Sequence, residues 1–180
     1  MIEFLSEENI ALHTEYIRQK RLKYSIIEGS IPVLSGADVR DIYRLKISAR
    51  DRKDAVVLLS EIRLHDIFFS SFCHSQYSHS AAVSKAFGSE AELLNRIYRK
   101  CMGASHGFVL VYVIGDKIEL TSTFDYGNVL RSIDPILAVD ICEHAYFMDY
   151  GFDKERYLLT SLPYLDLSRI APVKIKQGSE

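Results

Sequence analysis

The apolar pattern of this chain changes its period at residues 103–107, and that change restricts the folds that the chain can adopt. Before this break, apolar residues recur every three or four positions, as they do in helices. After it, β-branched and aromatic residues fill 108–114 and 118–123, and the intervening Gly115-Asp116 pair predicts the turn of a hairpin. The apolar run 135–141 predicts a third, buried strand. The predicted fold class is therefore α+β, with an all-helical N-terminal half.

The N-terminal half divides into helices and connectors. Ser6-Glu7-Glu8 is typical of a helix start, because a hydroxyl caps free N–H groups and acids suit the positive end of the helix dipole. The stretch 29–36 has glycines at both ends and an internal proline, which predicts a connector, and 37–47 predicts a short helix. The strongest apolar stripe predicts a long helix over 51–72.

Three further patterns complete the expected order of elements. Residues 70–80 are rich in serine and histidine, which predicts a loop. The tetrapeptide Ser89-Glu90-Ala91-Glu92 is typical of a capping box and predicts a helix that continues to Cys101. Residues 153–170 predict a closing helix that bends at Pro163, because proline removes a backbone donor.

Composition and charge exclude several classes of partner. The apolar content of 48% is normal for a globular protein with a sizeable core. The net charge is −2, with no long run of either sign, so neither nucleic acid nor an anionic membrane surface is an expected partner. The longest apolar runs fall well short of the ~18 residues that indicate a membrane span.

The N-terminus and the cysteines indicate the compartment. Met1 leads almost directly into the first predicted helix, so no secretory signal is expected. Cys73, Cys101 and Cys142 are odd in number and lack the spacing of metal ligands. They are interpreted as reduced thiols in a cytoplasmic protein.

Four residues place polar side chains at apolar positions. His13 and His65 each lie in the apolar stripe of a predicted helix, Asp140 ends an apolar strand, and His144 follows four residues later. A buried histidine or carboxylate must be hydrogen-bonded or bound to metal, because leaving it unpaired costs several kcal/mol. Three imidazoles and one carboxylate suit iron or manganese. The alternative is that each histidine is a satisfied core residue and that Asp140 caps a loop, since spacing alone does not bring the four together.

The segment 140–150, D-I-C-E-H-A-Y-F-M-D-Y, resembles the signature D-x-W-E-H-A-Y-Y-x-D-Y of iron/manganese superoxide dismutases. Leu5-Ser6-Glu7-Glu8, which leads to His13, and the segment 64–69 around His65 are similar to the family's two N-terminal ligand segments. Two glycine-containing stretches around the helix of 93–101 resemble its middle section, and they are Phe87-Gly88-Ser89 and Gly103-Ala104-Ser105. The resemblance runs from about residue 5 to residue 170, and the chain is identified as a divergent member of the family.

The resemblance implies an architecture and an activity. It implies an N-terminal helical hairpin lobe, residues 1–82, and a C-terminal α/β lobe, residues 83–180, with a three-stranded antiparallel sheet. It implies one iron or manganese ion per subunit between the lobes, and an antioxidant oxidoreductase that converts superoxide into O2 and H2O2. Its four metal ligands would be His13, His65, Asp140 and His144.

The resemblance also implies a homodimer. Glu143 matches the glutamate that, in the family, reaches across the dimer interface to a ligand histidine of the partner. A carboxylate in that place fixes the tautomer of the imidazole and raises its basicity. The alternative for Glu143 is an exposed acid on a turn.

Several residues around the expected site depart from the family. Arg21 stands where a tyrosine guards the substrate channel, eight residues after the first ligand. Arg21 is a candidate for guiding an anion, and the alternative is a solvated surface charge. Ile17 and Phe147 replace a histidine and a tyrosine that pair across the dimer, as if a hydrogen bond had become a hydrophobic contact.

The glutamine that hydrogen-bonds the metal-bound solvent in the family is also absent. In iron-type enzymes its position is Glu61 here, and in manganese-type enzymes the matching stretch is 123–127, T-F-D-Y-G. Glu61 shares a helix face with His65, so it is a candidate for tuning the metal or binding it directly, and the alternative is an exposed acid. The family's usual tryptophans are missing as well, with Cys142, Gly107, Val109 and Phe69 at their positions.

Three functions remain open at this level. The first is a divergent superoxide dismutase. The second is a metalloenzyme that keeps the ligands and catalyses another redox reaction of oxygen or peroxide. The third is a non-catalytic binding or structural protein on the same fold, against which the four matched ligands and the lack of positive charge count.

Overall fold

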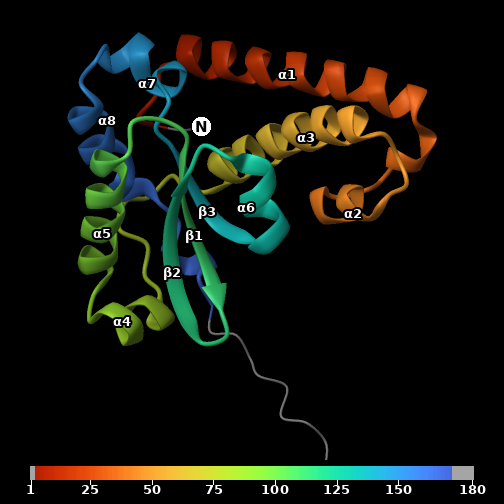
Figure 1. Ribbon diagram of the computed structural model, residues 1–180. Coiled ribbons are helices and arrows are strands. Elements are labelled where there is room, and N and C mark those ends of the chain that lie inside the picture. Colours follow the sequence, from red (N-terminus) through yellow and green to blue (C-terminus); the bar gives the residue numbers. More distant parts are fainter. Residues whose placement is uncertain (1–2, 172–180) are drawn as a thin grey trace, which may run out of the picture.

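The computed structural model describes residues 3–171, and their N-terminal half is helical (Figure 1). Two long helices lie side by side and form a hairpin, with a 3-10 turn and a short helix in the connection between them. These elements are α1 (Glu7–Ser30), η1 (Pro32–Leu34), α2 (Val39–Arg44) and α3 (Ala49–Ser70). Ser6 accepts a hydrogen bond from Asn9 N, so the predicted serine cap of α1 is confirmed.

The C-terminal half combines a small sheet with short helices. In chain order its elements are α4 (Ala81–Phe87), α5 (Glu90–Gly103), β1 (Phe108–Ile114), β2 (Lys117–Thr123), α6 (Tyr126–Ser132), β3 (Pro135–Asp140), α7 (Glu143–Tyr150), α8 (Lys154–Ser161), η2 (Leu162–Tyr164) and η3 (Leu167–Arg169). The strand order is β2-β1-β3, and both pairings are antiparallel. The predicted α+β class, with a helical hairpin followed by a three-stranded antiparallel sheet, is confirmed.

One hydrophobic core joins the two halves. Helix α3 packs against β3 with Leu64 and Phe68 fully buried, while α5 packs against β1 and β2. At the end of α3, Ser71 Oγ accepts a hydrogen bond of 2.8 Å from Ala138 N of β3. This packing fixes the C-terminal end of β3 relative to the middle of α3.

The closing helix is shorter than predicted. The pattern predicts a helix over 153–170 with a bend, but α8 ends at Ser161 and Pro163 lies in a 3-10 turn. Beyond this turn the chain pairs with the end of α3, where Cys73 N donates to Tyr164 O and Asp166 N donates to Ser71 O. The prediction of a continuing helix is therefore wrong, because these backbone bonds to another segment replace helical ones.

The structure also differs from the predicted elements at three short helices and at the cap of α5. The helices α4, α6 and α7 are not predicted from apolar spacing, because seven or eight residues are too short to show a helical period. Ser89 caps α5 as expected. The Glu92 carboxylate, which a capping box would direct back to the cap, instead accepts a hydrogen bond from Arg96 Nε at 2.8 Å. None of the helices in residues 3–171 is long and apolar enough to cross a membrane.

The boundary between the two lobes stays a prediction. The position between residues 82 and 83 falls inside α4, in a chain whose core is continuous across both halves. Residues 172–180 of the predicted C-terminal lobe lie outside the described residues.

Candidate metal centre

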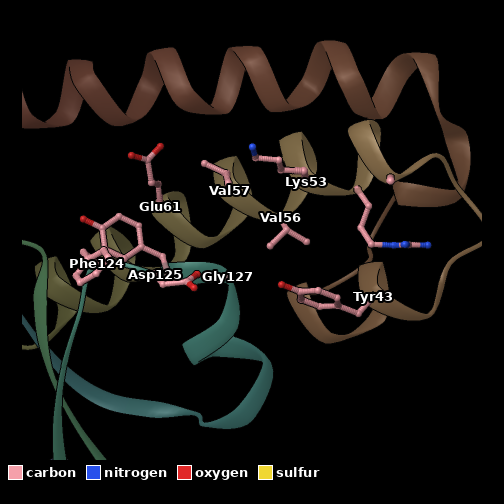
Figure 2. Close-up of a pocket in the computed structure, with 11 residues that line it drawn as sticks. Tyr43, Lys53, Val56, Val57, Glu61, Phe124, Asp125 and Gly127 are labelled. Carbon is pink, nitrogen blue, oxygen red and sulfur yellow. The ribbon is translucent and has the colours of Figure 1, made fainter.

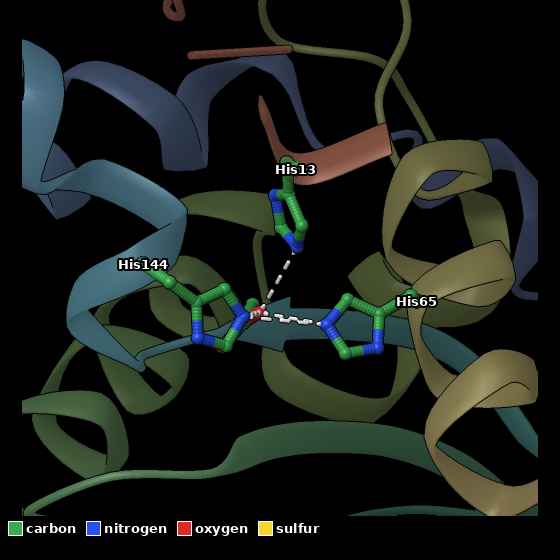
Figure 3. A group of neighbouring side chains, drawn as sticks. His13, His65 and His144 are labelled. Atoms are coloured by element: carbon green, nitrogen blue, oxygen red, sulfur yellow. Dashed lines mark hydrogen bonds and ion pairs between the residues drawn. The ribbon is translucent and has the colours of Figure 1, made fainter. Parts of the chain in front are cut away.

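Four segments that are distant in sequence bring the predicted ligand residues together (Figure 3). His13 comes from the middle of α1, His65 from α3, Asp140 from the last position of β3 and His144 from the first turn of α7. One ligand atom from each residue lies within 4.8 Å of the other three. The pattern of polar residues at apolar positions therefore corresponds to one cluster in space.

The three imidazoles converge on one carboxylate oxygen. Asp140 Oδ2 lies 3.1 Å from His144 Nε2 and 3.5 Å from both His13 Nε2 and His65 Nε2. His65 Nε2 and His144 Nε2 are 3.3 Å apart. Three nitrogens and one oxygen thus surround a common point, as ligands surround a cation.

Neighbouring backbone groups hold two of these side chains in place. Asp140 Oδ1 accepts a hydrogen bond of 2.9 Å from Cys142 N, which leaves Oδ2 facing the histidines. His65 Nδ1 lies 2.7 Å from the Glu61 carbonyl oxygen, and a carbonyl can only accept, so Nδ1 carries the proton. His65 Nε2 is then the free lone pair that a metal requires.

Buried polar atoms without hydrogen-bond partners test whether a cation fits this cluster. Among residues 3–171, both His13 Nε2 and Asp140 Oδ2 are buried and have no hydrogen bond. Such atoms are costly unless something satisfies them. A cation bound by both atoms would satisfy them, and a set of imidazoles with a carboxylate suits iron or manganese. The residues present therefore fit such an ion.

The protonation states also suit metal binding. Burial lowers the pKa of His65 to about 4, so this imidazole is neutral at pH 7. Burial raises the pKa of Asp140, but the attraction of the neighbouring imidazoles of His13 and His144 outweighs it, and the pKa lies below its usual range. Asp140 is therefore ionised and His65 neutral, as a metal ligand must be.

Comparison with known families agrees with this geometry. Residues 75–171 match the model of the iron/manganese superoxide dismutase C-terminal domain. The chain belongs to this family. The match includes Asp140 and His144, while His13 and His65 lie before it and join the cluster through the fold.

Curated superoxide dismutases are similar at low identity. An iron enzyme of Cupriavidus metallidurans is 27% identical over 116 residues, which cover 59% of this chain and 58% of that protein. A manganese/iron enzyme of Rickettsia prowazekii is 30% identical over 78 residues, 42% of this chain and 37% of that protein. A mitochondrial manganese enzyme of Aspergillus oryzae is 31% identical over 106 residues, 59% and 46% of the two chains. The chain thus spans about half the length of the curated relatives that it matches.

A second layer of side chains lies around the ligand cluster. The Tyr16 ring stacks on His144 with centroids 4.9 Å apart, and its hydroxyl donates to Glu61 Oε1 at 3.2 Å. Lys20 Nζ lies 2.7 Å from Glu61 Oε2. The Glu61 carboxylate is therefore engaged by a phenol and an ammonium group.

Tyr16 and Lys20 are absent from the sequence predictions, although a signal for them exists. They follow His13 by three and seven residues, a spacing that places all three on one face of α1. A search for polar residues along the face that carries His13 would have found both.

The remaining predicted site residues lie outside the ligand cluster. Arg21 pairs with Asp66 at 2.5 Å, and both side chains are about half exposed. Ile17 is buried, whereas Glu143 is exposed. Phe147 is 44% exposed and contacts Phe152 edge to face. The structure describes one chain, so the roles across a dimer interface stay predictions.

Proposed function

We propose that this chain is a superoxide dismutase with one iron or manganese ion per subunit, held by His13, His65, Asp140 and His144. The convergence of their four ligand atoms within 4.8 Å carries the proposal, in a chain of this family. When bound, the ion supplies the redox couple that oxidises one superoxide to O2 and reduces a second to H2O2.

The chain would control how substrate and water reach the centre. His13, His65 and Asp140 are at most 2% exposed, whereas the His144 side chain is 37% exposed. The His144 side is therefore the entry for a small anion, and the buried side excludes bulk water. Tyr16 stacks on His144 and narrows this entry.

The Glu61 carboxylate would otherwise repel superoxide. Its ion pair with Lys20 offsets the negative charge, and the Tyr16 hydroxyl stabilises the same carboxylate. We assign Glu61 the role of tuning the centre through this network. Arg21 lies one residue beyond Lys20 on α1 and adds positive potential for guiding an anion, although Asp66 screens it.

The proposal includes a cytoplasmic homodimer. The exposed Phe147 lies on α7, the short helix that carries His144 and the exposed Glu143, and the exposed Phe152 lies just beyond its end. A second copy on this face would cover apolar surface and bring Glu143 toward the partner's centre. All three cysteines are free, which fits a reducing compartment.

The test is superoxide decay by the purified protein, normalised to the iron and manganese measured in the same sample. We expect decay proportional to bound metal. His65→Ala should lose both metal and activity, while His79→Ala, at an exposed histidine paired with Glu90, should retain them. Bound metal with decay no faster than background would refute the dismutase.

A second candidate is a metalloenzyme with the same ligands and another redox reaction of oxygen or peroxide. The Tyr16, Glu61 and Lys20 network favours it, because a paired carboxylate stands where the family places a neutral glutamine. Stoichiometric metal in the wild type without dismutation, together with metal loss in His65→Ala, is the result expected from this candidate.

A further inference from the structure

A cavity of about 510 Å3 lies beside α3 (Figure 2), and none of the four candidate metal ligands is among the residues that line it. Its walls come from α3, from Tyr43 of α2 and from residues 124–127, which run from the end of β2 into α6. Pockets for small organic molecules have volumes of this order. The dismutase proposal gives this cavity no role, since superoxide is a diatomic anion.

The shape of the cavity depends on one close approach. A Cβ at Gly127 would lie 2.4 Å from Val56 Cγ1, so only glycine allows the start of α6 to lie this near α3. Val56, Val57 and Phe124 make the middle of the cavity apolar. This part of the wall is thus closely packed against the Val56 side chain, and the apolar middle suits a hydrophobic body.

The charges of the lining are divided between the two ends. Figure 2 shows Glu61 and Asp125 toward one end, whereas the Lys53 side chain lies nearer the middle and extends toward α1. Arg52 and Glu61 are nine positions apart on α3, which corresponds to roughly 13 Å along a helix. A ligand that spans the cavity would therefore meet Arg52 at one end and carboxylates at the other.

Arg52 is the strongest indication of an anionic ligand. Its guanidinium is held by the Leu45 carbonyl, to which Nη2 donates at 2.8 Å. Its Nε is buried and has no hydrogen-bond partner within residues 3–171. A guanidinium held in place at the cavity wall is suited to a carboxylate, with which it forms charged hydrogen bonds.

We propose that this cavity binds a small aromatic carboxylate with a hydroxyl group at its far end. The carboxylate pairs with Arg52, the ring packs on Val56 and Val57, and the hydroxyl donates to Glu61 or Asp125. Glu61 also contacts Tyr16, which stacks on His144, so the ligand adjoins the outer layer of the metal centre. The binding itself requires no metal and no dismutase activity.

Isothermal titration calorimetry with para-hydroxyphenylpropanoate tests the proposal on the purified full chain, before and after chelation of metal. We expect saturable binding in both states. Arg52→Gln should weaken binding about tenfold or more, because the charged hydrogen bonds are lost. Arg50→Gln, at an exposed arginine of the same helical turn outside the cavity, should bind as the wild type does.

Arg52 donates hydrogen bonds to the Leu45 and Ile47 carbonyls between α2 and α3, and Arg52→Gln could unfold the protein by losing them. A second variant keeps the test valid in that case. Val57→Phe fills the cavity from a position that is 46% exposed, and it should abolish binding in a protein with the wild-type circular dichroism spectrum. Absence of binding by the wild type would overturn the proposal. So would unchanged binding in folded Val57→Phe, or tighter binding of the cationic para-hydroxyphenylethylamine.

Discussion

The two carboxylate oxygens of Asp140 have different partners, and this difference orders the whole cluster. Oδ1 is held by the Cys142 amide, and the Asp140 carbonyl accepts a hydrogen bond of 3.0 Å from the buried Tyr157 hydroxyl. Oδ2 is left to face three imidazoles. A strand end with this backbone support positions a ligand more rigidly than a free loop would.

Titration of His65 gives a prediction for the metal-free protein. Burial lowers the folded-state pKa to about 4, below the value of about 6.5 in the unfolded chain, so the unfolded chain binds more protons between these values. The free energy of unfolding therefore decreases as pH falls from about 6.5 to 4, by on the order of 3 kcal/mol from this residue. Urea denaturation at pH 7 and 4.5 measures the difference.

His65→Asn should flatten this pH dependence, because asparagine does not titrate. His79→Asn is the matched control, since its side chain is 75% exposed and paired at the surface with Glu90. A His65→Asn protein with the wild-type slope would assign the acid sensitivity to another group.

Substitutions of Glu61 and of Lys20 should shift the reduction potential of a bound ion in opposite directions. Glu61→Gln removes a negative charge near the centre, which destabilises the higher oxidation state and raises the reduction potential. Lys20→Met removes a positive charge and should lower that potential. Redox titration of both loaded variants measures the two shifts, and shifts of the same sign would contradict a charge effect.

At the scale of elements, the site depends on how α1 and α7 are joined. Asn9 Nδ2 donates to the Ala145 carbonyl at 3.2 Å and to Asp149 Oδ2 at 2.9 Å, and Ser6 N donates to the same Oδ2 at 2.9 Å. These bonds tie the first turn of α1, which precedes His13, to the helix that carries His144. Asn9 is fully buried, so its hydrogen bonds connect α1 and α7, the helices that carry His13 and His144, inside the protein.

Asn9→Ala should therefore lower the free energy of unfolding by about 1–3 kcal/mol, because it removes two hydrogen bonds that a buried amide makes to the Ala145 carbonyl and the Asp149 carboxylate. Metal affinity should fall as well, since two ligands lose their fixed separation. Urea denaturation and metal titration measure these effects. Asn95→Ala, at an exposed asparagine of α5, should change neither.

The elements also show what the sequence could predict. The hairpin and third strand follow from runs of β-formers, and the histidines of α1 and α3 are visible as polar residues in apolar stripes. The end of α8 could not be predicted in this way, because it depends on backbone bonds between residues 164–166 and the end of α3. The contact of Tyr16 with His144 likewise requires α7 to pack beside α1, which no local pattern encodes.

At the scale of the molecule, the ligand cluster is buried on three sides and open on one. His13, His65 and Asp140 lie inside the continuous core, whereas the His144 side chain is 37% exposed. Large apolar side chains are exposed on α7, the helix that carries His144, and just beyond its end: Phe147 at 44%, Met148 at 50% and Phe152 at 84%. Such a patch beside the opening is typical of a surface that a second copy covers.

Phe147→Glu should therefore convert a dimer into a monomer, because it places a charge at the centre of an apolar interface. Analytical ultracentrifugation at micromolar concentration measures the change in mass. Leu159→Glu is the matched control, since Leu159 is 60% exposed on α8 outside this patch, and that variant should remain dimeric. If the wild type is itself a monomer, Glu143 cannot reach a partner's histidine. If Phe147→Glu remains a dimer, the interface lies on another face and Glu143 loses its assigned place in it.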